Sequence, residues 1–400
     1  MTRFTTSFLI LLMFAGAPMV MAQGQGQDHA PILIPDSSVE HPGDVGLLAH
    51  TNHLIRLAGP PGGGGGPSGE TPQSIRPVYN IPSVGGANTI VIVDAFHYAT
   101  ALNDFNVFAS QFGLPVETST DPLNPANKVF QVVYAAGAQP RKNCGWAQEA
   151  ALDIEWAHAM APSAKIVLVE AASNSFTNLF SAVDVGSQQP GASELSMSWG
   201  GSEFSSEASN DSHMTHAGTV YFASSGDTGG VTIYPGVSPN VVSAGGTRIN
   251  RNAAGTFVSE TAWSGSGGGP STFEPRPAYQ TVVASIVGTQ RGAPDFSFDA
   301  DPATGVSVFD STPCQGLSGW LVFGGTSVAS PSLSGIVNLA ASQPGGVFAA
   351  NSTAELTNIY ANLGTANFRD IVSGTAGTFS AGPGWDFVTG VGSNQGLVGK

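Results

Sequence analysis

The chain has 400 residues, enough for one large domain or two ordinary ones, and only 10% of them are charged, against about 25% in ordinary domains. Its formal net charge of −15 argues against nucleic acid as a partner, because nucleic-acid-binding domains carry basic patches. A chain with few charged pairs also loses little stability when its carboxylates become protonated. The composition therefore favours acid tolerance, although a Gly-, Ser- and Ala-rich secreted protein without that property has a similar composition.

The first 22 residues have the pattern of a secretory signal peptide. Arg3 precedes an apolar run from residue 8 to about 17, and Val20 and Ala22 suit cleavage after Ala22. The run is short for a membrane span, and an uncleaved anchor is the alternative interpretation. We therefore expect a secreted protein, extracellular or periplasmic, without membrane contact after cleavage. We also expect a monomer, although this pattern does not indicate the oligomeric state.

The two cysteines, Cys144 and Cys314, can form one disulfide in an exported chain, although the sequence does not show whether they do. Two cysteines alone cannot make a zinc site, and the histidines show no HExxH spacing. The sequence therefore predicts no transition-metal site.

The chain order predicts a polar amino-terminal segment followed by an α/β domain. Residues 23–74 form the polar segment, which contains a flexible Gly/Pro-rich stretch at 60–67, and the domain extends over 75–400. Short apolar strands are predicted at 89–94, 128–134, 165–170, 195–200 and 219–224, and helices at 99–112, 146–160, 175–186 and 327–341. This alternation predicts a mainly parallel central sheet with helices on both faces.

The segment GGTSVASP at 324–331 places Ser327 at the amino end of an apolar helix. There the helix dipole and free amides would favour a developing oxyanion, although an ordinary helix cap fits the same spacing. The segment resembles the nucleophile motif of the subtilisin-like clan, in which the serine opens a helix.

An ordinary subtilisin also needs an aspartate after its first strand and a histidine in a His-Gly-Thr context. Asp94 occupies a suitable position, but the sequence contains no His-Gly-Thr. We interpret His97, His213 and His216 as structural or surface residues, and a conventional subtilisin that uses one of them stays open as an alternative.

Glu149 and Asp153 are the candidates for a catalytic base other than histidine. Residues four apart share one face of a helix, and two like charges there should raise the pKa of at least one carboxyl. Such pairs also occur on solvated helices, but this helix is poor in cations and its neighbours are apolar: Trp146, Leu152, Ile154, Trp156 and Met160. Glu155 lies on another face, and we assign it a structural role.

Together these residues resemble the sedolisin, or serine-carboxyl peptidase, family. The resemblance runs from about Arg76 to Ser393 and rests on segments that occur in order: TIVIVDA at 89–95, the 149–162 segment with DIEWAHA, SWG at 198–200, ASSGD at 223–227 and PDFSFDADP at 294–302. It implies a subtilisin-like three-layer fold and a serine endopeptidase that cleaves protein or peptide substrates through an acyl-enzyme.

The resemblance implies one role for each of four residues. Ser327 is the nucleophile, Glu149 is its general base and later the acid for the leaving amine, and Asp153 hydrogen-bonds Glu149 and orients it. Asp227 donates to the oxyanion, for which it must be protonated; without the resemblance it would be a turn residue. Because Glu149 must be ionised and Asp227 protonated, the expected activity window is acidic.

The resemblance also implies one structural Ca²⁺ near the carboxyl terminus. It maps carboxylate ligands to Asp370 and Asp386 and carbonyl ligands to Ile371, Gly382 and Gly384. Calcium takes six to eight oxygens, and glycines let carbonyls converge. A Gly/Pro loop with two solvated acids is the alternative, and the EF-hand spacing is absent from the sequence.

The sequence departs from the family pattern at its amino end. Many family members carry a long inhibitory propeptide, whereas about fifty residues separate the predicted signal peptide from the domain here. How premature activity is restrained therefore stays open. A non-catalytic, calcium-stabilised peptide-binding relative and an acid tripeptidyl peptidase are further alternatives, and side-chain specificity is not indicated.

Overall fold

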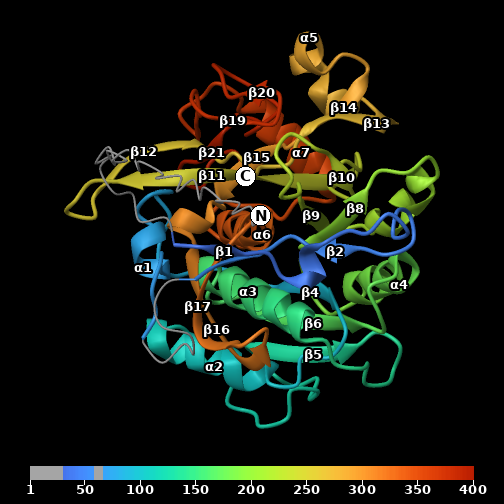
Figure 1. Cartoon of the computed structure of the whole chain (residues 1–400), viewed down its shortest axis with the longest axis vertical. Coiled ribbons are helices and arrows are strands. Elements are labelled where there is room, and N and C mark those ends of the chain that lie inside the picture. Colours follow the sequence, from blue (N-terminus) through green and yellow to red (C-terminus); the bar gives the residue numbers. More distant parts are fainter. Residues whose placement is uncertain (1–29, 58–65) are drawn as a thin grey trace, which may run out of the picture.

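The computed structural model describes residues 30–57 and 66–400, so the predicted signal peptide lies outside the described residues. A central sheet runs through the molecule (Figure 1). Its strands, in spatial order, are β18 (Phe368–Arg369), β21 (Ser393–Asn394), β15 (Phe296–Asp299), β11 (Val241–Arg251), β9 (Val220–Ser224), β7 (Ala192–Met197), β4 (Thr89–Ala95), β6 (Lys165–Ala171) and β5 (Phe130–Tyr134), with β12 (Phe257–Ala262) beside β11.

The sheet is mainly parallel, as the sequence predicts. Every neighbouring pair from β21 to β5 is parallel, and only β12 on β11 and β18 on β21 are antiparallel. All seven residues of β4 are buried, because a parallel strand covered on both faces is apolar throughout. The carboxyl ends of β4, β7 and β9 therefore meet at one edge, where α/β proteins form sites.

Helices cover both faces of the sheet and make three layers. One apolar core joins the sheet to α2 (Ala101–Phe112), α3 (Cys144–Met160) and α6 (Thr326–Ala341). A second core on the other face joins it to α4 (Phe176–Ser187) and the 3₁₀ helix η2 (Glu207–Met214). The remaining α-helices are α1 (Pro72–Ile75), α5 (Ala284–Val287) and α7 (Ser352–Ala361), and the other 3₁₀ helices are η1 (Asp36–Ser38), η3 (Ala278–Val283) and η4 (Pro302–Thr304).

Helices α3 and α6 lie against each other in the middle of the molecule (Figure 1). Their backbones approach closely at Gly335, where a Cβ atom would lie 2.7 Å from Met160 Cβ. This contact fixes the predicted acid pair and the predicted nucleophile on neighbouring helices.

Smaller sheets flank the central one. The strands β1 (Ile32–Leu33), β3 (Leu54–Arg56), β17 (Leu317–Gly324) and β16 (Val306–Cys314) form an antiparallel sheet, and β2 (His50–Thr51), β8 (Trp199–Ser202) and β10 (Ile233–Tyr234) form another. Two-stranded sheets pair β13 (Gly269–Pro275) with β14 (Gln290–Ala293) and β19 (Thr375–Ala376) with β20 (Phe379–Ser380).

The described residues ahead of Ile75 thus contribute three strands, which the polar composition of this segment did not predict. Strands of two or three residues leave no periodic signal, and their partners lie far away in sequence. The predicted strand at 195–200 is also interrupted, since β7 ends at Met197 and β8 begins at Trp199.

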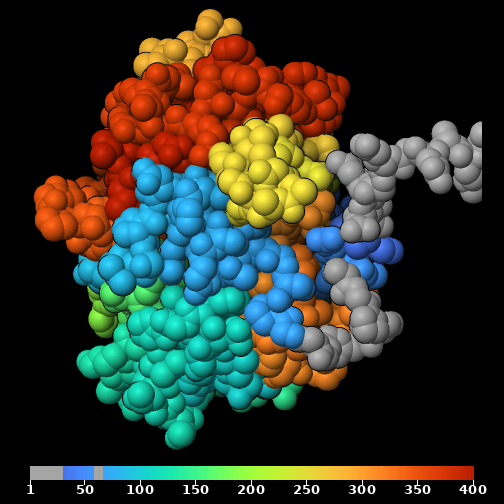
Figure 2. Space-filling view, turned by 90° about the vertical axis from the view of Figure 1, so that its left-hand side faces the viewer, coloured from blue at the N-terminus to red at the C-terminus, as the bar shows by residue number. Residues whose placement is uncertain are grey.

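The carboxyl-terminal segment packs against an early part of the domain. Figure 2 shows the red C-terminal residues directly beside the light-blue segment. Gly396 N donates to Tyr79 O at 2.9 Å, and the Arg369 guanidinium donates to Val78 O at 2.7 Å.

Among the described residues, the helices are too short or too polar to cross a bilayer.

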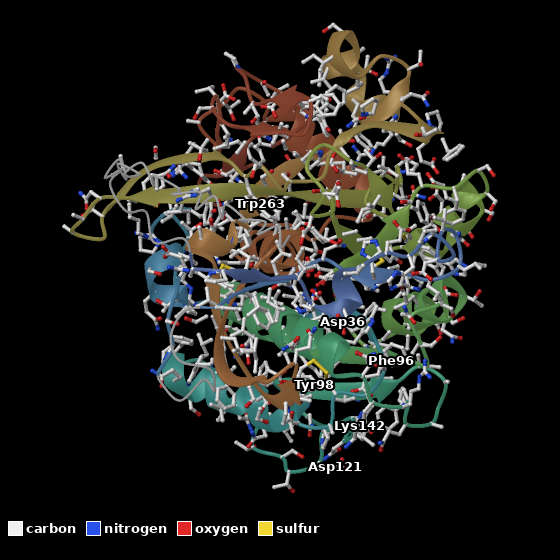
Figure 3. The ribbon with its side chains drawn as sticks, viewed as in Figure 1. Asp36, Phe96, Tyr98, Asp121, Lys142 and Trp263 are labelled. Atoms are coloured by element: carbon white, nitrogen blue, oxygen red, sulfur yellow. A yellow bond between two sulfur atoms is a disulfide. The ribbon has the colours of Figure 1, made fainter. Side chains whose placement is uncertain are left out.

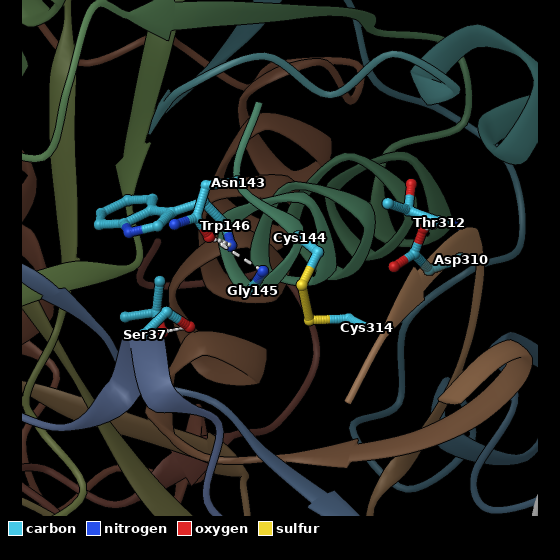
Figure 4. The surroundings of a disulfide bond; sticks show 9 residues. Ser37, Asn143, Cys144, Gly145, Trp146, Asp310, Thr312 and Cys314 are labelled. Atoms are coloured by element: carbon cyan, nitrogen blue, oxygen red, sulfur yellow. Dashed lines mark hydrogen bonds between the residues drawn. A yellow bond between two sulfur atoms is a disulfide. The ribbon is translucent and has the colours of Figure 1, made fainter. Parts of the chain in front are cut away.

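Cys144 and Cys314 form a disulfide, with their Cα atoms 5.3 Å apart. It joins the first residue of α3 to the end of β16 (Figure 4). The bond settles the pairing that the sequence left open.

Candidate active site

Helix α3 holds the predicted acid pair in the interior. Asn143 caps the helix by accepting hydrogen bonds from the backbone N–H groups of Gly145 and Trp146 at 3.0 and 3.2 Å, and the disulfide anchors its first residue. Glu149 and Asp153 are both 0% exposed. The pair is therefore buried, as its apolar neighbours indicated.

Asp153 lies in a cluster of buried carboxyls. Its Oδ1 accepts a hydrogen bond from Ser198 Oγ at 2.9 Å. The expected hydrogen bond between Asp153 and Glu149 is not formed, because Glu149 Oε2 pairs with His53 and the other oxygens of the two acids have no partner. Burial and the nearby charges of Asp94 and Glu149 raise the pKa of Asp153, and burial with the charges of Glu149 and Glu170 raises the pKa of Asp94. At least one carboxyl of the cluster thus keeps its proton beyond the ordinary range, in line with the sequence prediction.

Glu155 lies apart from this cluster. Its Oε2 accepts a hydrogen bond from Phe309 N at 3.0 Å, so it ties α3 to β16. This contact agrees with the structural role assigned from the sequence.

Ser327 lies in the first turn of α6 and is fully buried. Its Oγ donates to the backbone carbonyl of Ser198 at 3.2 Å, and Ser198 Oγ is 3.4 Å from Ser327 O. Ser198 therefore links the Asp153 carboxyl to the predicted nucleophile. It occupies the break between β7 and β8, where the chain leaves the regular strand.

The turn into α6 depends on Gly325. This residue has φ +96°, and a Cβ atom on it would collide with Asp227 Oδ2 and with the carbonyl oxygen of Asn52. Only glycine fits where these groups converge.

Asp227 is fixed through one of its two carboxyl oxygens. Oδ1 accepts hydrogen bonds from the N–H and the hydroxyl of Thr326 at 2.7 and 2.8 Å. Oδ2 is screened from solvent without a partner, although the residue as a whole is only half-buried. Burial raises the pKa of Asp227 to about 8, and a protonated Oδ2 would be a donor beside the start of α6.

Two residues that the sequence did not single out enter this site. His53 Nδ1 lies 2.7 Å from Glu149 Oε2, with both side chains buried. The carbonyl oxygen of Asn52 accepts a hydrogen bond from Ser327 N at 3.0 Å. No spacing motif marks either residue, since both belong to the polar segment ahead of the domain.

Two of the histidines weighed from the sequence have different partners. His97 Nδ1 pairs with Glu170 Oε2 at 2.8 Å. His213 pairs with Asp184 at 2.8 Å and stacks on Phe180. These contacts favour structural roles over a conventional subtilisin base.

The two acids of the predicted calcium site reach the same glycine-containing loop. Gly384 N donates to Asp370 Oδ2 at 3.0 Å, and Gly382 N donates to Asp386 Oδ2 at 3.1 Å. Ile371 is buried. Among the described residues no three His, Cys, Asp or Glu side chains cluster as a metal site, so a cation here would depend on these two carboxylates with backbone carbonyls and water, which suits calcium.

Comparison with known proteins identifies similar sequences. No protein-family model matches the chain. It is 33% identical to kumamolisin from Bacillus sp. (strain MN-32) over 288 residues, which are 62% of this chain and 49% of that protein. It is also 33% identical to sedolisin from Pseudomonas sp. (strain 101) over 177 residues, 40% of this chain and 28% of that protein. The chain thus matches about half the length of the first relative and less of the second.

A solved structure extends this similarity to the fold. The structure is Pseudomonas sedolisin, a serine-carboxyl proteinase, complexed with two molecules of pseudo-iodotyrostatin. It superimposes with a TM-score of 0.69 and 25% identity, covering 82% of this chain and 96% of that one. The match confirms the predicted subtilisin-like three-layer fold.

Proposed function

Because the chain belongs to the sedolisin family of serine-carboxyl peptidases, we propose that it is a secreted serine endopeptidase that cleaves unfolded proteins in acid. One observation carries the proposal: a buried Glu149–Asp153 pair joined through Ser198 to a serine at a helix start. A buried acid pair is costly to keep, and its helix α3 packs against α6, the helix whose first turn contains Ser327, which would give the pair a chemical use.

In the proposed reaction Glu149 removes the proton from Ser327 Oγ, which attacks the substrate carbonyl carbon. Asp153, one helical turn further along α3, would orient Glu149. The resulting tetrahedral species collapses to an acyl-enzyme while Glu149 returns the proton to the leaving amine. Water, with Glu149 as its base, then attacks the acyl-enzyme in the same way, releases the carboxylic acid product and restores Ser327.

Two donors would stabilise the oxyanion. The N–H of Ser327 opens α6, where the helix dipole favours negative charge, and protonated Asp227 adds its Oδ2–H. A pKa of about 8 keeps this proton in place throughout the acid range. Removing one such donor typically costs about 10²–10³ in kcat.

The buried carboxyl cluster supports activity in acid. Asp94, Glu149 and Asp153 share a small buried volume, and the pKa values of Asp94 and Asp153 are raised. Burial and mutual repulsion therefore keep Asp94 and Asp153 protonated beyond the ordinary range of a carboxyl. As the pH rises through the raised pKa values of Asp94 and Asp153, these carboxyls ionise close to the site and the rate should fall.

A structural calcium ion belongs to the same proposal. Asp370 and Asp386 would supply carboxylate oxygens, and Ile371, Gly382 and Gly384 would supply carbonyls. The ion would stabilise the loop that ends the domain and take no part in the chemistry. The disulfide supports export, because such bonds persist in oxidising compartments.

We place the signal peptide at 1–22, the amino-terminal Gly/Pro-rich segment at 23–74 and the peptidase domain at 75–400.

The test is incubation with denatured protein between about pH 3 and 5, with Ser327→Ala as the control. The proposal expects hydrolysis by the wild type and none by the variant. A chain that binds peptide without cleaving it would be a non-catalytic relative and would contradict the proposal. Release of tripeptides alone would identify an exopeptidase and contradict the endopeptidase assignment.

A further inference from the structure

A row of polar side chains crosses the central sheet near the carboxyl ends of its strands. Asp94 of β4 is in register with Glu170 of β6, and Glu170 is in register with Tyr134 of β5. Each of the three lies two residues beyond a member of the apolar core that α2 and α3 share with the sheet. Alternate residues of a strand share one face, so the row lies on the face that these helices cover. It leads from the carboxyl cluster of the proposed site to β5, the edge strand.

The inner end of the row is closed to solvent. Asp94, Glu149 and Asp153 are all buried, and among the described residues neither carboxyl oxygen of Asp94 has a hydrogen-bond partner. The charges of Glu149 and Glu170 both act on Asp94. Neighbouring strands lie about 4.8 Å apart, so a hydrogen bond or one bridging water can join Asp94 to Glu170. A proton that leaves or enters the cluster therefore has a path along the row.

The outer end of the row reaches solvent through His97. Its Nδ1 lies 2.8 Å from Glu170 Oε2, and the side chains of His97 and Glu170 are 12% and 1% exposed. The imidazole stands edge-on to Tyr134, with ring centres 5.7 Å apart. His97, Tyr134 and Tyr98 (labelled in Figure 3) line a cleft of about 840 Å³ to which α2, β5 and the loop at 119–122 also contribute. Solvent in this cleft can reach His97, whereas Glu170 lies behind it.

Glu170 and His97 share a proton. Burial raises the pKa of Glu170 to about 8, and burial with the charge of Lys142 lowers the pKa of His97. These shifts reverse the usual order, in which the imidazole is the stronger base, so the Glu170 carboxyl holds the shared proton and donates it to Nδ1. The other charged group that acts on the row is Asp121, beside Tyr134.

We propose that Glu170 and His97 form a proton relay that connects the buried base of the proposed active site to solvent in the cleft beside α2. This inference rests on the proposed peptidase function and names the residues that reset the charge of its base. His97 does not replace Glu149 as the base. It acts through Glu170 at one end of the row, whereas Ser327 contacts Ser198 beyond β7, on the opposite side of β4.

Each transfer in the relay moves one proton and leaves all other bonds intact. When Glu149 must be reset, it passes its proton to Asp94, while Asp94 passes its own proton to Glu170 Oε1. Glu170 passes the proton on its Oε2 to His97 Nδ1, and His97 releases the proton on Nε2 to water. Protonation of the cluster follows the reverse path. The relay thus restores an ionised Glu149 even when substrate excludes water from the side of Ser327.

The first test compares Glu170→Gln with the wild type on a fluorescence-quenched peptide at about pH 4. Glutamine keeps the size of the side chain and can still donate to His97, but it cannot pass a proton on. The relay predicts a kcat lower by about tenfold or more, with little change in KM or in melting temperature. The matched control is Glu194→Gln, because Glu194 is also buried, with a pKa raised to about 8, but bonds to Asn338 instead.

The outcomes of this first test separate the relay from the peptidase function. An unchanged kcat in Glu170→Gln, or an equal loss in Glu194→Gln, would overturn the relay and leave the function standing. A wild type that hydrolyses neither this peptide nor denatured protein would overturn the proposed function itself.

The second test asks whether a small acid can replace the imidazole. His97→Ala opens the cleft toward Glu170, and acetate at about pH 5 can carry protons between that carboxyl and water. Acetate added at constant ionic strength, with chloride as the balancing anion, should restore kcat of the variant to a plateau and leave the wild type unchanged. His213→Ala is the matched control, because His213 also pairs with a carboxylate, Asp184 at 2.8 Å, but stacks in the core on the other face of the sheet.

The control should show neither the loss of kcat nor the rescue. A loss in His97→Ala that acetate does not restore would assign this residue a structural role and overturn the relay, even if Glu170→Gln fails to fold. A kcat equal to that of the wild type in His97→Ala would also overturn it.

Discussion

Replacing Asp227 by asparagine tests the electrostatics of the site. Asparagine keeps the shape of aspartic acid and can donate a hydrogen bond, but it cannot ionise. The structure raises the pKa of Asp227 from 3.8 to about 8, chiefly through burial. That difference corresponds to roughly 6 kcal/mol of stability.

The pKa of Asp227 is higher in the folded chain than in the unfolded chain, so its effect on the free energy of unfolding depends on pH. The stability that protonated Asp227 contributes is fully present below about pH 4. It is lost as the pH rises from there through about 8. Asp227→Asn should lose none of it, so the variant should gain several kcal/mol over the parent near pH 9.

Urea unfolding near pH 5 and pH 9, with Ser327→Ala in both chains to prevent self-digestion, measures this difference. Asp121→Asn is the matched control, because Asp121 is exposed at the edge of the molecule (Figure 3). In active chains, Asp227→Asn should retain activity near pH 4, whereas Asp227→Ala should lose about 10²–10³ in kcat. The same pH dependence of stability in the parent and in Asp227→Asn would refute the reasoning.

Three further predictions concern the base, the metal and the disulfide. Glu149→Gln should lower kcat/KM by about 10²–10⁴ near pH 4, since it removes general-base catalysis; near-full activity in the variant, or a wild-type pH–rate maximum near pH 8, would exclude the carboxyl mechanism. Chelator should lower the melting temperature measured by calorimetry in metal-free buffer, and an unchanged value would argue against the calcium site. The Cys144→Ser/Cys314→Ser double variant should be less stable by up to roughly 5 kcal/mol, because the bond closes a loop with a sequence separation of 170; equal urea midpoints would contradict this expectation.

The sequence predicted those parts of the molecule that depend on local patterns. The apolar runs gave β4, β6 and β9, and their alternation with helices gave a parallel sheet. The four-residue spacing of Glu149 and Asp153 placed both on one face of α3, and the apolar residues around them indicated burial. Each of these inferences uses residues that are close together in the chain.

The missed features depend on contacts between distant residues. Asn52 and His53 reach the site because β2 and β3 pair with β8 and β17, and strands this short carry no periodic signal. The break at Ser198 has the same origin, since the 195–200 run is apolar enough to predict one continuous strand. His53 and Glu149 are 96 residues apart, so only the folded chain shows that they meet.

The central claim is that Glu149 activates Ser327 to form an acyl-enzyme. Its most direct test is acid quenching of the enzyme during turnover of an activated peptide ester, followed by peptide mapping by mass spectrometry. The wild type should carry an acyl group on Ser327, and Glu149→Gln should carry a strongly reduced amount. An acyl group on another residue, or equal labelling of Ser327 in both proteins, would contradict it.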